Sequence, residues 1–163
     1  MARSVFYSFH YKNDISRVMV VRNRWVSFGS QIISGIIDHA EFEQVQRQGD
    51  LAIKRWIDSQ LIGTTATIVL IGAETLNRPY VKYEIMQSRK RENAIIGVYV
   101  NNIEDFYRRK SLACSKYTIV GYENGSPLFF SEVADGIYDY VSNDGYHNLD
   151  SWIEKAVRSL YYK

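Results

Sequence analysis

The chain alternates short apolar runs with amphipathic stretches, which is the pattern of strands joined by helices. Ser4 to Phe9 is rich in aromatic and β-branched residues and predicts a first strand. Gln31 to Asp38, Ala66 to Ile71 and Ala94 to Val100 are largely apolar on successive residues, as expected of parallel strands covered on both faces. These four runs predict a buried parallel sheet.

Helical periodicity fills the gaps between the predicted strands. The apolar positions of the first two helices are Val18, Val21 and Trp25, followed by Ile53, Trp56, Ile57 and Leu61. Gly63 stands just past the second helix, where a C-cap belongs, and Pro79 suits the first position of the third helix. Strands that alternate with helices imply βαβ crossovers. The predicted fold class is therefore α/β, a flavodoxin-like doubly wound parallel sheet with helices on both faces.

The pattern is weaker after Asn101. Tyr117 to Tyr122 is compatible with a fifth strand, whereas Ser126 to Gly145 shows no clean period. An apolar stripe then predicts a terminal helix over residues 148–161 that packs on the sheet, with Asn148 as its N-cap. The stripe consists of Leu149, Trp152, Ile153, Ala156, Val157 and Leu160. No repeat or linker divides the sequence, so we expect one domain over residues 1–163.

Composition and charge narrow the class of protein. Hydrophobic residues make up 46% and charged residues 23%, which are ordinary globular values, and a net charge of +2 is too small to imply a nucleic-acid partner. Cys114 is the only cysteine, which excludes an internal disulfide and a multi-cysteine zinc site. Met1 to Ser8 lacks the apolar run of a signal peptide, and no stretch approaches the roughly 20 apolar residues that span a bilayer. We therefore expect a cytoplasmic protein without a membrane partner.

Chemistry is expected at the carboxyl ends of the strands, where open α/β sheets bind their ligands. Four segments lie at these strand ends: Ser8 to Lys12, Asp38 to Glu43, Gly72 to Arg78 and Val100 to Ile103. Glu84 lies on the helix after the third strand, with Tyr80 four residues earlier on the same face. Position alone leaves two interpretations of Glu84, a surface carboxylate paired with a basic residue and an acidic group of a binding site.

Three long segments resemble the TIR domain in its bacterial branch. They are VFYSFHYKND, ATIVLIGAETLNRPYVKYEI and NAIIGVYV. The shorter blocks VRNRW, RWI, VLIG, VKYEIM, IIGVYVN and DYVSNDGY are similar to TIR-like proteins of the Thoeris antiphage system. The resemblance covers residues 1–100 well and residues 101–163 poorly. It implies that Glu84 is the catalytic carboxylate, with Tyr80 where many TIR enzymes carry tryptophan.

The resemblance also implies a function. A TIR-like enzyme of antiphage defence uses NAD as its substrate and holds no permanent cofactor. It cleaves the bond between nicotinamide and ribose and releases a signal of the cyclic ADP-ribose or ADP-ribosyl class. The implied partners are NAD, further copies of the chain through TIR–TIR self-association, an effector protein reached through the diffusible nucleotide, and a phage-derived trigger.

By resemblance to the first TIR loop, Ser8, Phe9 and His10 are expected to contact the dinucleotide. Tyr80 is expected to contact it as well. Strand alternation would place Phe9 and Tyr11 on one face and Ser8 and His10 on the other. Phe9 is equally compatible with a place in the core. Asp38 contacts the substrate or shapes a loop on one interpretation, and simply begins a loop on the other.

One carboxylate is chemically sufficient for this cleavage. Glycoside hydrolysis passes through an oxocarbenium-like state and normally needs two carboxylates, one of which protonates the leaving group. Nicotinamide leaves NAD as a neutral molecule without being protonated, so no general acid is required. A single ionised Glu84 can stabilise the developing cation and orient the ribose hydroxyls.

Other chemistries fit the sequence less well. A hydrolase triad of Ser8, His10 and Asp38 is disfavoured because no Gly-x-Ser-x-Gly elbow surrounds the serine. No metal is expected, because neither His39 nor His147 has ligand spacing. A response-regulator receiver would need an acidic pair after the first strand, where this chain has Phe-His-Tyr. A nucleoside deoxyribosyltransferase-like enzyme and a non-catalytic TIR-like adaptor remain open alternatives.

Overall fold

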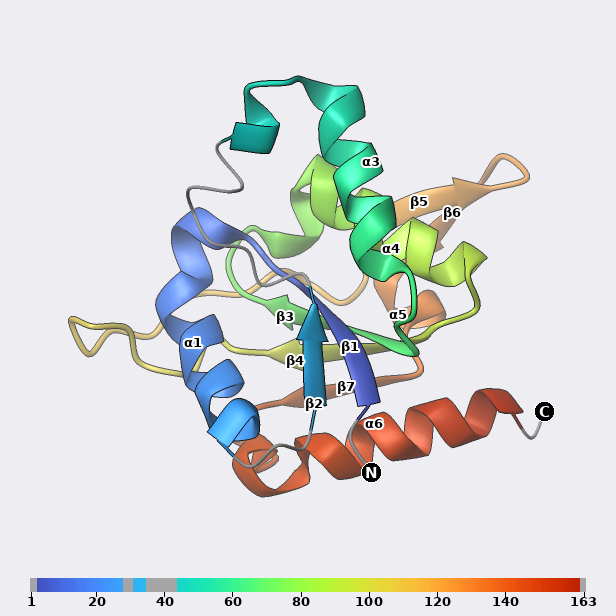
Figure 1. Ribbon diagram of the computed structural model, residues 1–163. Coiled ribbons are helices and arrows are strands. Elements are labelled where there is room, and N and C mark those ends of the chain that lie inside the picture. The colour runs from blue at the N-terminus through green and yellow to red at the C-terminus, as the bar shows by residue number, and fades with distance from the viewer. Residues whose placement is uncertain (1–2, 28–30, 35–43, 162–163) are drawn as a thin grey trace.

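A parallel sheet of five strands forms the centre of the computed structural model, which describes residues 3–27, 31–34 and 44–161 (Figure 1). The strands stand in the order β2-β1-β3-β4-β7. Their bounds are β1 Arg3–Ser8, β2 Gln31–Ser34, β3 Ala66–Ile71, β4 Ala94–Tyr99 and β7 Gly136–Asp139. All neighbouring pairs are parallel, so the predicted doubly wound fold class is confirmed.

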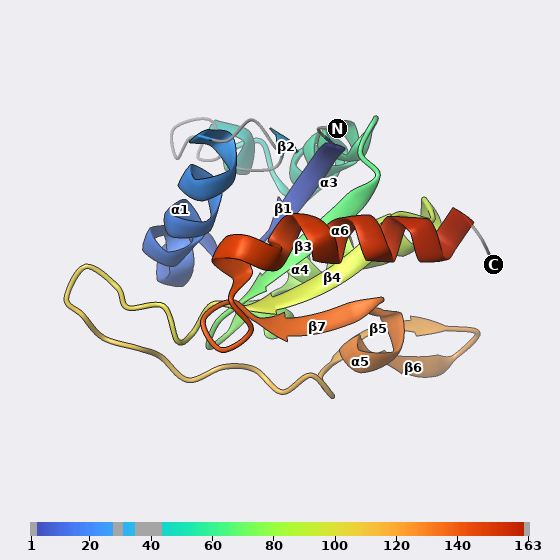
Figure 2. The ribbon, with the colours of Figure 1, turned by 90° about the horizontal axis from the view of Figure 1, so that it is seen from below.

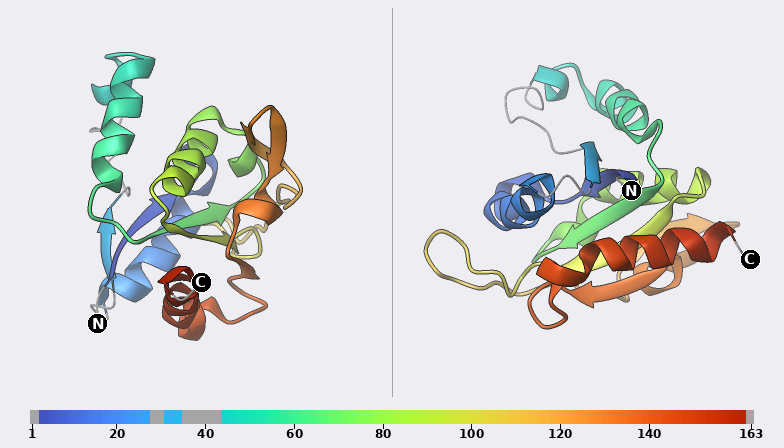
Figure 3. Two further views of the ribbon diagram at one scale, coloured as in Figure 1. Left: turned by 90° about the vertical axis from the view of Figure 1, so that its right-hand side faces the viewer. Right: turned by 60° about the horizontal axis from the view of Figure 1, so that its bottom comes forward.

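Helices cover both faces of this sheet (Figure 3). Their bounds are α1 Tyr11–Ser27, α3 Asp50–Leu61, the 3-10 turn η1 Thr75–Asn77, α4 Pro79–Lys90, α5 Phe130–Val133 and α6 Gly145–Tyr161. Helices α1 and α6 share one apolar cluster with the sheet, while α4 and α5 share another on the opposite face and α3 packs on Phe6. Pro79 occupies the first helical position and Gly63 follows α3 with a positive φ of 83°, as predicted.

The core follows from alternation along the central strand. Every residue of β3 is buried. Ile68 and Leu70 face α1 and α6, whereas Val69 and Ile71 face α4 and α5. A strand buried on both faces must be apolar on successive residues, which is why the runs in β3 and β4 were predicted with nearly correct bounds.

The C-terminal part differs from the prediction in three respects. The segment compatible with a fifth strand overlaps β5 (Ile119–Glu123), but β5 pairs antiparallel with β6 (Ser126–Phe129) in a separate hairpin sheet. The fifth strand of the main sheet is β7, whose four residues are only half-buried and therefore show no apolar run. Helix α6 begins at Gly145, so the assignment of Asn148 as N-cap was wrong.

Helix α6 packs across the sheet near β4 and β7, as predicted (Figure 2). The indole ring of Trp152 stacks on Tyr138 of β7, with ring centroids 4.1 Å apart and an interplanar angle of 3°. At the other end of the sheet, Arg3 forms an ion pair with Glu154. Among the described helices, none has the length and apolar character needed to cross a membrane.

Candidate active site

The side chain of Glu84 contacts the end of strand β1 on the face of the sheet covered by α3 and α4. Phe6 of β1 points into the cluster formed with α3, and strand alternation gives Ser8, two residues later, the same direction. Ser8 is fully buried, and its hydroxyl donates a hydrogen bond to Glu84 Oε2. Because β1 lies between β2 and β3, this pair stands at the point where the strand order reverses, the usual ligand position in such sheets.

The surroundings of Glu84 favour its neutral form. Burial raises the pKa of this carboxyl to about 8, and the hydrogen bond from Ser8 acts in the opposite direction because it stabilises the ionised form. The residue as a whole is half-buried, so part of it remains accessible from outside. At neutral pH the resting chain therefore holds most of this carboxyl protonated.

Four polar side chains converge near the carboxyl ends of β1 and β3. Asn13 Nδ2 donates to Glu74 Oε2 at 2.6 Å. The same oxygen lies 3.7 Å from Arg78 Nη2 and 3.9 Å from His10 Nδ1. Burial, followed by the nearby Arg78 cation, lowers the pKa of His10, and the Glu74 carboxylate opposes this change. We call His10, Asn13, Glu74 and Arg78 the rim cluster.

Tyr80 turns its hydroxyl toward α3. Its ring packs against the cluster around Phe6 and Ile57, and its hydroxyl donates to Asp50 Oδ1 at 3.0 Å. Tyr80 thus occupies the same helix face as Glu84, as its spacing predicted, and joins α4 to the start of α3. A contact between Tyr80 and the dinucleotide stays a prediction.

Phe9 and Tyr11 do not extend the first strand. Strand β1 ends at Ser8 and Tyr11 opens helix α1, so the expected strand alternation over residues 8–11 was wrong. Phe9 is half-buried and packs against the apolar cluster shared with α1 and α6. Its ring centroid lies 6.3 Å from that of Tyr11. Asp38 lies outside the described residues.

A buried ion pair supports the loop after β3. Asp14 and Arg17 of α1 are nearly inaccessible, and Arg17 Nη1 lies 3.5 Å from Asp14 Oδ1. The hydroxyl of Thr75 accepts from Gly72 N at 2.8 Å and lies 3.4 Å from Asp14 Oδ2. A Cβ at position 72 would overlap the Asp14 carboxylate, so this glycine is required for close packing. Gly72 therefore has a structural role in the loop after β3.

Arg17 also anchors the segment that follows β4. Its guanidinium donates from Nε to the carbonyl of Ile103 at 2.7 Å and from Nη2 to the carbonyl of Arg109 at 2.9 Å. Between these two points the chain projects away from the sheet (Figure 2). Sequence reasoning missed this anchor because neither carbonyl leaves a signature in the side-chain pattern.

Sequence reasoning also missed Glu74 and Arg78 as individual residues. The segment Gly72 to Arg78 was predicted to lie at a strand end, and it does. The available signal was the Pro79 that follows, because a residue before a helix-opening proline is the N-cap and its side chain stands beside the helix terminus. Charge alone could not distinguish these two residues from ordinary surface groups.

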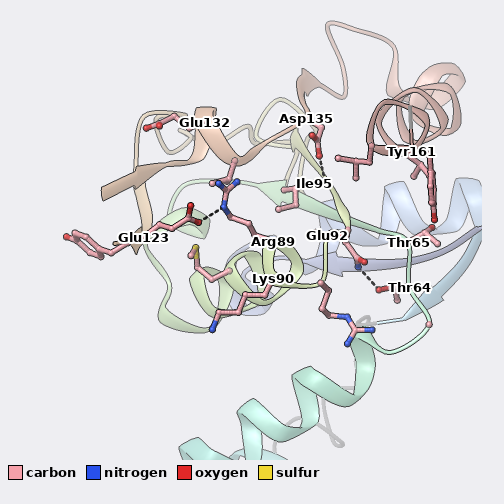
Figure 4. A pocket seen from close by; sticks show the side chains of 18 residues that line it. Thr64, Thr65, Arg89, Lys90, Glu92, Ile95, Glu123, Glu132, Asp135 and Tyr161 are labelled. Carbon is pink, nitrogen blue, oxygen red and sulfur yellow. Dashed lines mark hydrogen bonds and ion pairs between the residues drawn. The ribbon is translucent and has the colours of Figure 1, made fainter. Parts of the chain in front are cut away.

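A cavity of about 1000 Å³ lies at the opposite end of the sheet, away from Glu84. It is lined by the last turn of α4, the starts of β3 and β4, the hairpin and the end of α6 (Figure 4). Arg89 on its wall donates to Glu123 at 3.0 Å, and Asp135 accepts from Ile95 N at 2.8 Å. Three charged side chains of this wall, Arg89, Glu123 and Asp135, thus have partners within the protein.

Comparison with known proteins agrees with the geometry. Residues 6–105 match the sequence family described as "Thoeris protein ThsB, TIR-like domain". A protein of Bacillus cereus (strain MSX-D12) named "Putative cyclic ADP-D-ribose synthase ThsB1" is 34% identical over 191 aligned positions. That alignment covers 94% of this chain and 100% of the relative. Ser8, the rim cluster and Glu84 all fall inside the matched family region.

Proposed function

The chain belongs to the TIR-like domain family of the Thoeris protein ThsB, and on this premise we propose that it is an NAD-consuming enzyme of antiphage defence. It cleaves the nicotinamide–ribose bond and produces a cyclic ADP-ribose-type or ADP-ribosyl signal that activates a separate effector. The name of the Bacillus cereus relative supports this class of product. The observation that carries the proposal is the buried Glu84 carboxyl beside Ser8 at the switch point of the sheet.

The chemistry requires Glu84 in its ionised form. The C1′–N1 bond breaks with both electrons leaving on the nicotinamide nitrogen, and positive charge develops on the ribose. A carboxylate beside C1′ stabilises that charge until a nucleophile forms the new bond to C1′. A nitrogen of the adenine base gives a cyclic product, and water gives the linear one.

NAD itself helps to ionise the carboxyl. Its pyridinium ring is cationic before cleavage, and an opposite charge within a few ångströms lowers the pKa of a carboxyl. Binding of the substrate therefore opposes the effect of burial on Glu84 and releases the proton that the resting site retains. Ser8, already donating to the carboxylate oxygen, supports the ionised form.

The deciding experiment measures nicotinamide release from NAD by the purified protein, alone and with phage lysate or a crowding agent. Glu84→Gln is nearly isosteric, and we expect it to reduce release by about 10² to 10³-fold. Glu104→Gln, an exposed glutamate on the segment after β4, is the matched control and should retain activity. Activity that survives Glu84→Gln contradicts the site, and no release under any condition favours the non-catalytic adaptor.

Self-association belongs to the same proposal. By its resemblance to TIR enzymes, the chain would act as an assembly, and a phage-derived trigger would promote that assembly. Light scattering of the protein with and without phage lysate, in parallel with nicotinamide release, tests whether the two rise together.

A further inference from the structure

Three nitrogen donors in the rim cluster point at one carboxylate oxygen that does not satisfy them all. Glu74 Oε2 accepts from Asn13 Nδ2 at 2.6 Å, which is a good hydrogen bond. The separations of 3.7 Å to Arg78 Nη2 and 3.9 Å to His10 Nδ1 are too long for hydrogen bonds. Arg78 Nη2 and His10 Nδ1 thus lie near the Glu74 carboxylate without a hydrogen bond to it.

Two nitrogens in this cluster are buried and have no hydrogen-bond partner among the residues that the structure describes. They are His10 Nδ1 and Arg78 Nε. Buried polar atoms in folded proteins are almost always paired, so an unpaired one calls for a partner such as water, an ion or a ligand. Both nitrogens lie at the carboxyl end of the sheet, which is the edge where Ser8 and Glu84 also lie.

The position of Arg78 relative to Glu84 matches the order of groups in NAD. Arg78 is the N-cap of α4 and Glu84 lies six residues further along, which corresponds to about 9 Å along the helix axis. In NAD only the ribose ring and one methylene separate the cleaved bond from the diphosphate. A ribose beside Glu84 therefore has a diphosphate close enough to reach the start of α4.

The start of α4 favours an anion at this place. The helix has 12 residues, and no side chain of its N-cap residue closes the first turn. Its partial positive charge adds to the Arg78 guanidinium, and Lys12 is close enough to affect the pKa of His10. Among the described residues, the charged groups in and around the cluster are the cations of Lys12 and Arg78 and the carboxylate of Glu74, with Asp14 and Asp50 on the helices beside it.

We propose that Arg78 and His10 bind the diphosphate of NAD, and that the Glu74 carboxylate occupies the diphosphate position until substrate arrives. The inference rests on the proposed function, because it names the subsite that orients the same substrate. Glu74 therefore competes with the diphosphate for Arg78 and His10. Its side chain is 53% exposed, so it can turn into solvent when a phosphate with more acceptor oxygens replaces it.

The experiment uses ADP-ribose as the probe, because it keeps the diphosphate and lacks the bond that is cleaved. Calorimetry should show that Arg78→Gln weakens ADP-ribose binding at least tenfold, that Arg78→Lys retains part of the affinity, and that Glu74→Gln tightens binding. Adenosine, which has no phosphate, should bind all variants equally. With NAD, Glu74→Gln should lower KM.

Arg89→Gln and Glu123→Gln are the matched controls, since they break a comparable pair near the other end of α4 and should not alter ADP-ribose binding. The proposal is overturned if Arg78→Gln binds ADP-ribose like the wild type, if Glu74→Gln binds it more weakly, or if neither wild type nor Glu74→Gln binds it. If binding follows the expected order while nicotinamide is never released, the diphosphate site stands and the cleavage proposal fails.

Discussion

Glu84 combines two properties that conflict with each other. Burial makes its neutral form more stable at neutral pH, whereas the proposed chemistry needs a negative charge. The conflict is typical of catalytic groups, whose pKa values are displaced because their surroundings suit the reaction more than the resting protein. The residue can therefore be tested by its titration as well as by its removal.

The pH profile of NAD cleavage is the first prediction. Because kcat/KM reports the free enzyme, it should rise with pH and level off above a pKa of about 8, where Glu84 ionises. Ser8→Ala removes the hydrogen bond that favours the ionised form, so the rise should move to higher pH. Nicotinamide release at low NAD between pH 6 and 9.5 measures both profiles. A flat wild-type profile contradicts the titration of Glu84. An unshifted Ser8→Ala profile, or one shifted to lower pH, contradicts the role of Ser8.

The stability of Glu84→Gln is the second prediction. The folded pKa of about 8 lies above the ordinary value of 4.5, so folded wild type holds a proton that the unfolded chain releases. Wild-type stability from this group is fully present below pH 4.5 and is lost as pH rises through 8. Gln does not titrate, so the Tm advantage of Glu84→Gln should grow from pH 5 to pH 8. For the control Glu104→Gln, the difference in Tm from the wild type should not change with pH. If the difference for Glu84→Gln does not change either, Glu84 is ionised in the folded protein and the prediction is wrong.

Single residues could be predicted only where a motif supported them. Glu84 carries no distinguishing local pattern, and it was identified because its block resembles the TIR domain. Glu74 and Arg78 have no equivalent block, and their significance comes from the distances that join Glu74 to His10 and to Arg78 in the folded chain. Sequence spacing identifies neighbours along one helix but not donors that converge from separate loops.

Helix α1 joins the segment after β4 to the loop before α4 through one ion pair. Arg17 binds two carbonyls of the projecting segment, and Asp14 contacts the loop that carries Glu74. The pair is buried, so its two charges depend on each other. Removing one partner of a buried ion pair leaves the other without compensation.

Arg17→Met is the third prediction. We expect it to lower the free energy of unfolding by about 3 to 5 kcal/mol, because Asp14 would remain buried and unpaired. The double variant with Asp14→Asn should recover part of that loss. Urea unfolding measures all three proteins, and Arg55→Met, an exposed arginine of α3, is the matched control. An Arg17→Met protein as stable as the wild type would show that the pair contributes little.

The more deeply a strand is buried, the better the sequence predicted it. Strands β3 and β4 are covered on both faces, so their apolar runs indicate them directly. Strand β7 lies at the sheet edge with half-buried residues, and its pairing to β4 depends on a partner 40 residues earlier in the chain. Strand β5 was predicted as a strand, but its antiparallel pairing depends on the turn at Asn124 and Gly125, whose φ values are both positive.

The candidate site and helix α6 lie on different parts of the molecule. Ser8, the rim cluster and Glu84 lie on or beside β1, β3 and the start of α4, while α6 covers the opposite face. The matched family region, residues 6–105, contains the first group and ends before α6. Substitutions in α6 should therefore alter stability without altering the chemistry.

Leu149→Ala is the fourth prediction. Leu149 is fully buried between α6 and the sheet, so truncation should lower the free energy of unfolding by about 2 to 5 kcal/mol. Below the melting transition, kcat/KM for NAD should equal the wild-type value. Val141→Ala, at a side chain that is 51% exposed, should change stability by less than about 0.5 kcal/mol. A large loss of kcat/KM in folded Leu149→Ala would show that α6 influences the site.

The ring pair of Trp152 and Tyr138 gives the protein an intrinsic optical probe. Two aromatic rings held parallel at 4.1 Å in a chiral, immobile setting contribute to near-ultraviolet circular dichroism. Signals of this kind disappear when side-chain packing loosens, even where helices persist. The pair joins α6 to the edge strand β7, remote from Glu84, so its spectrum reports native packing in any active-site variant without an added label.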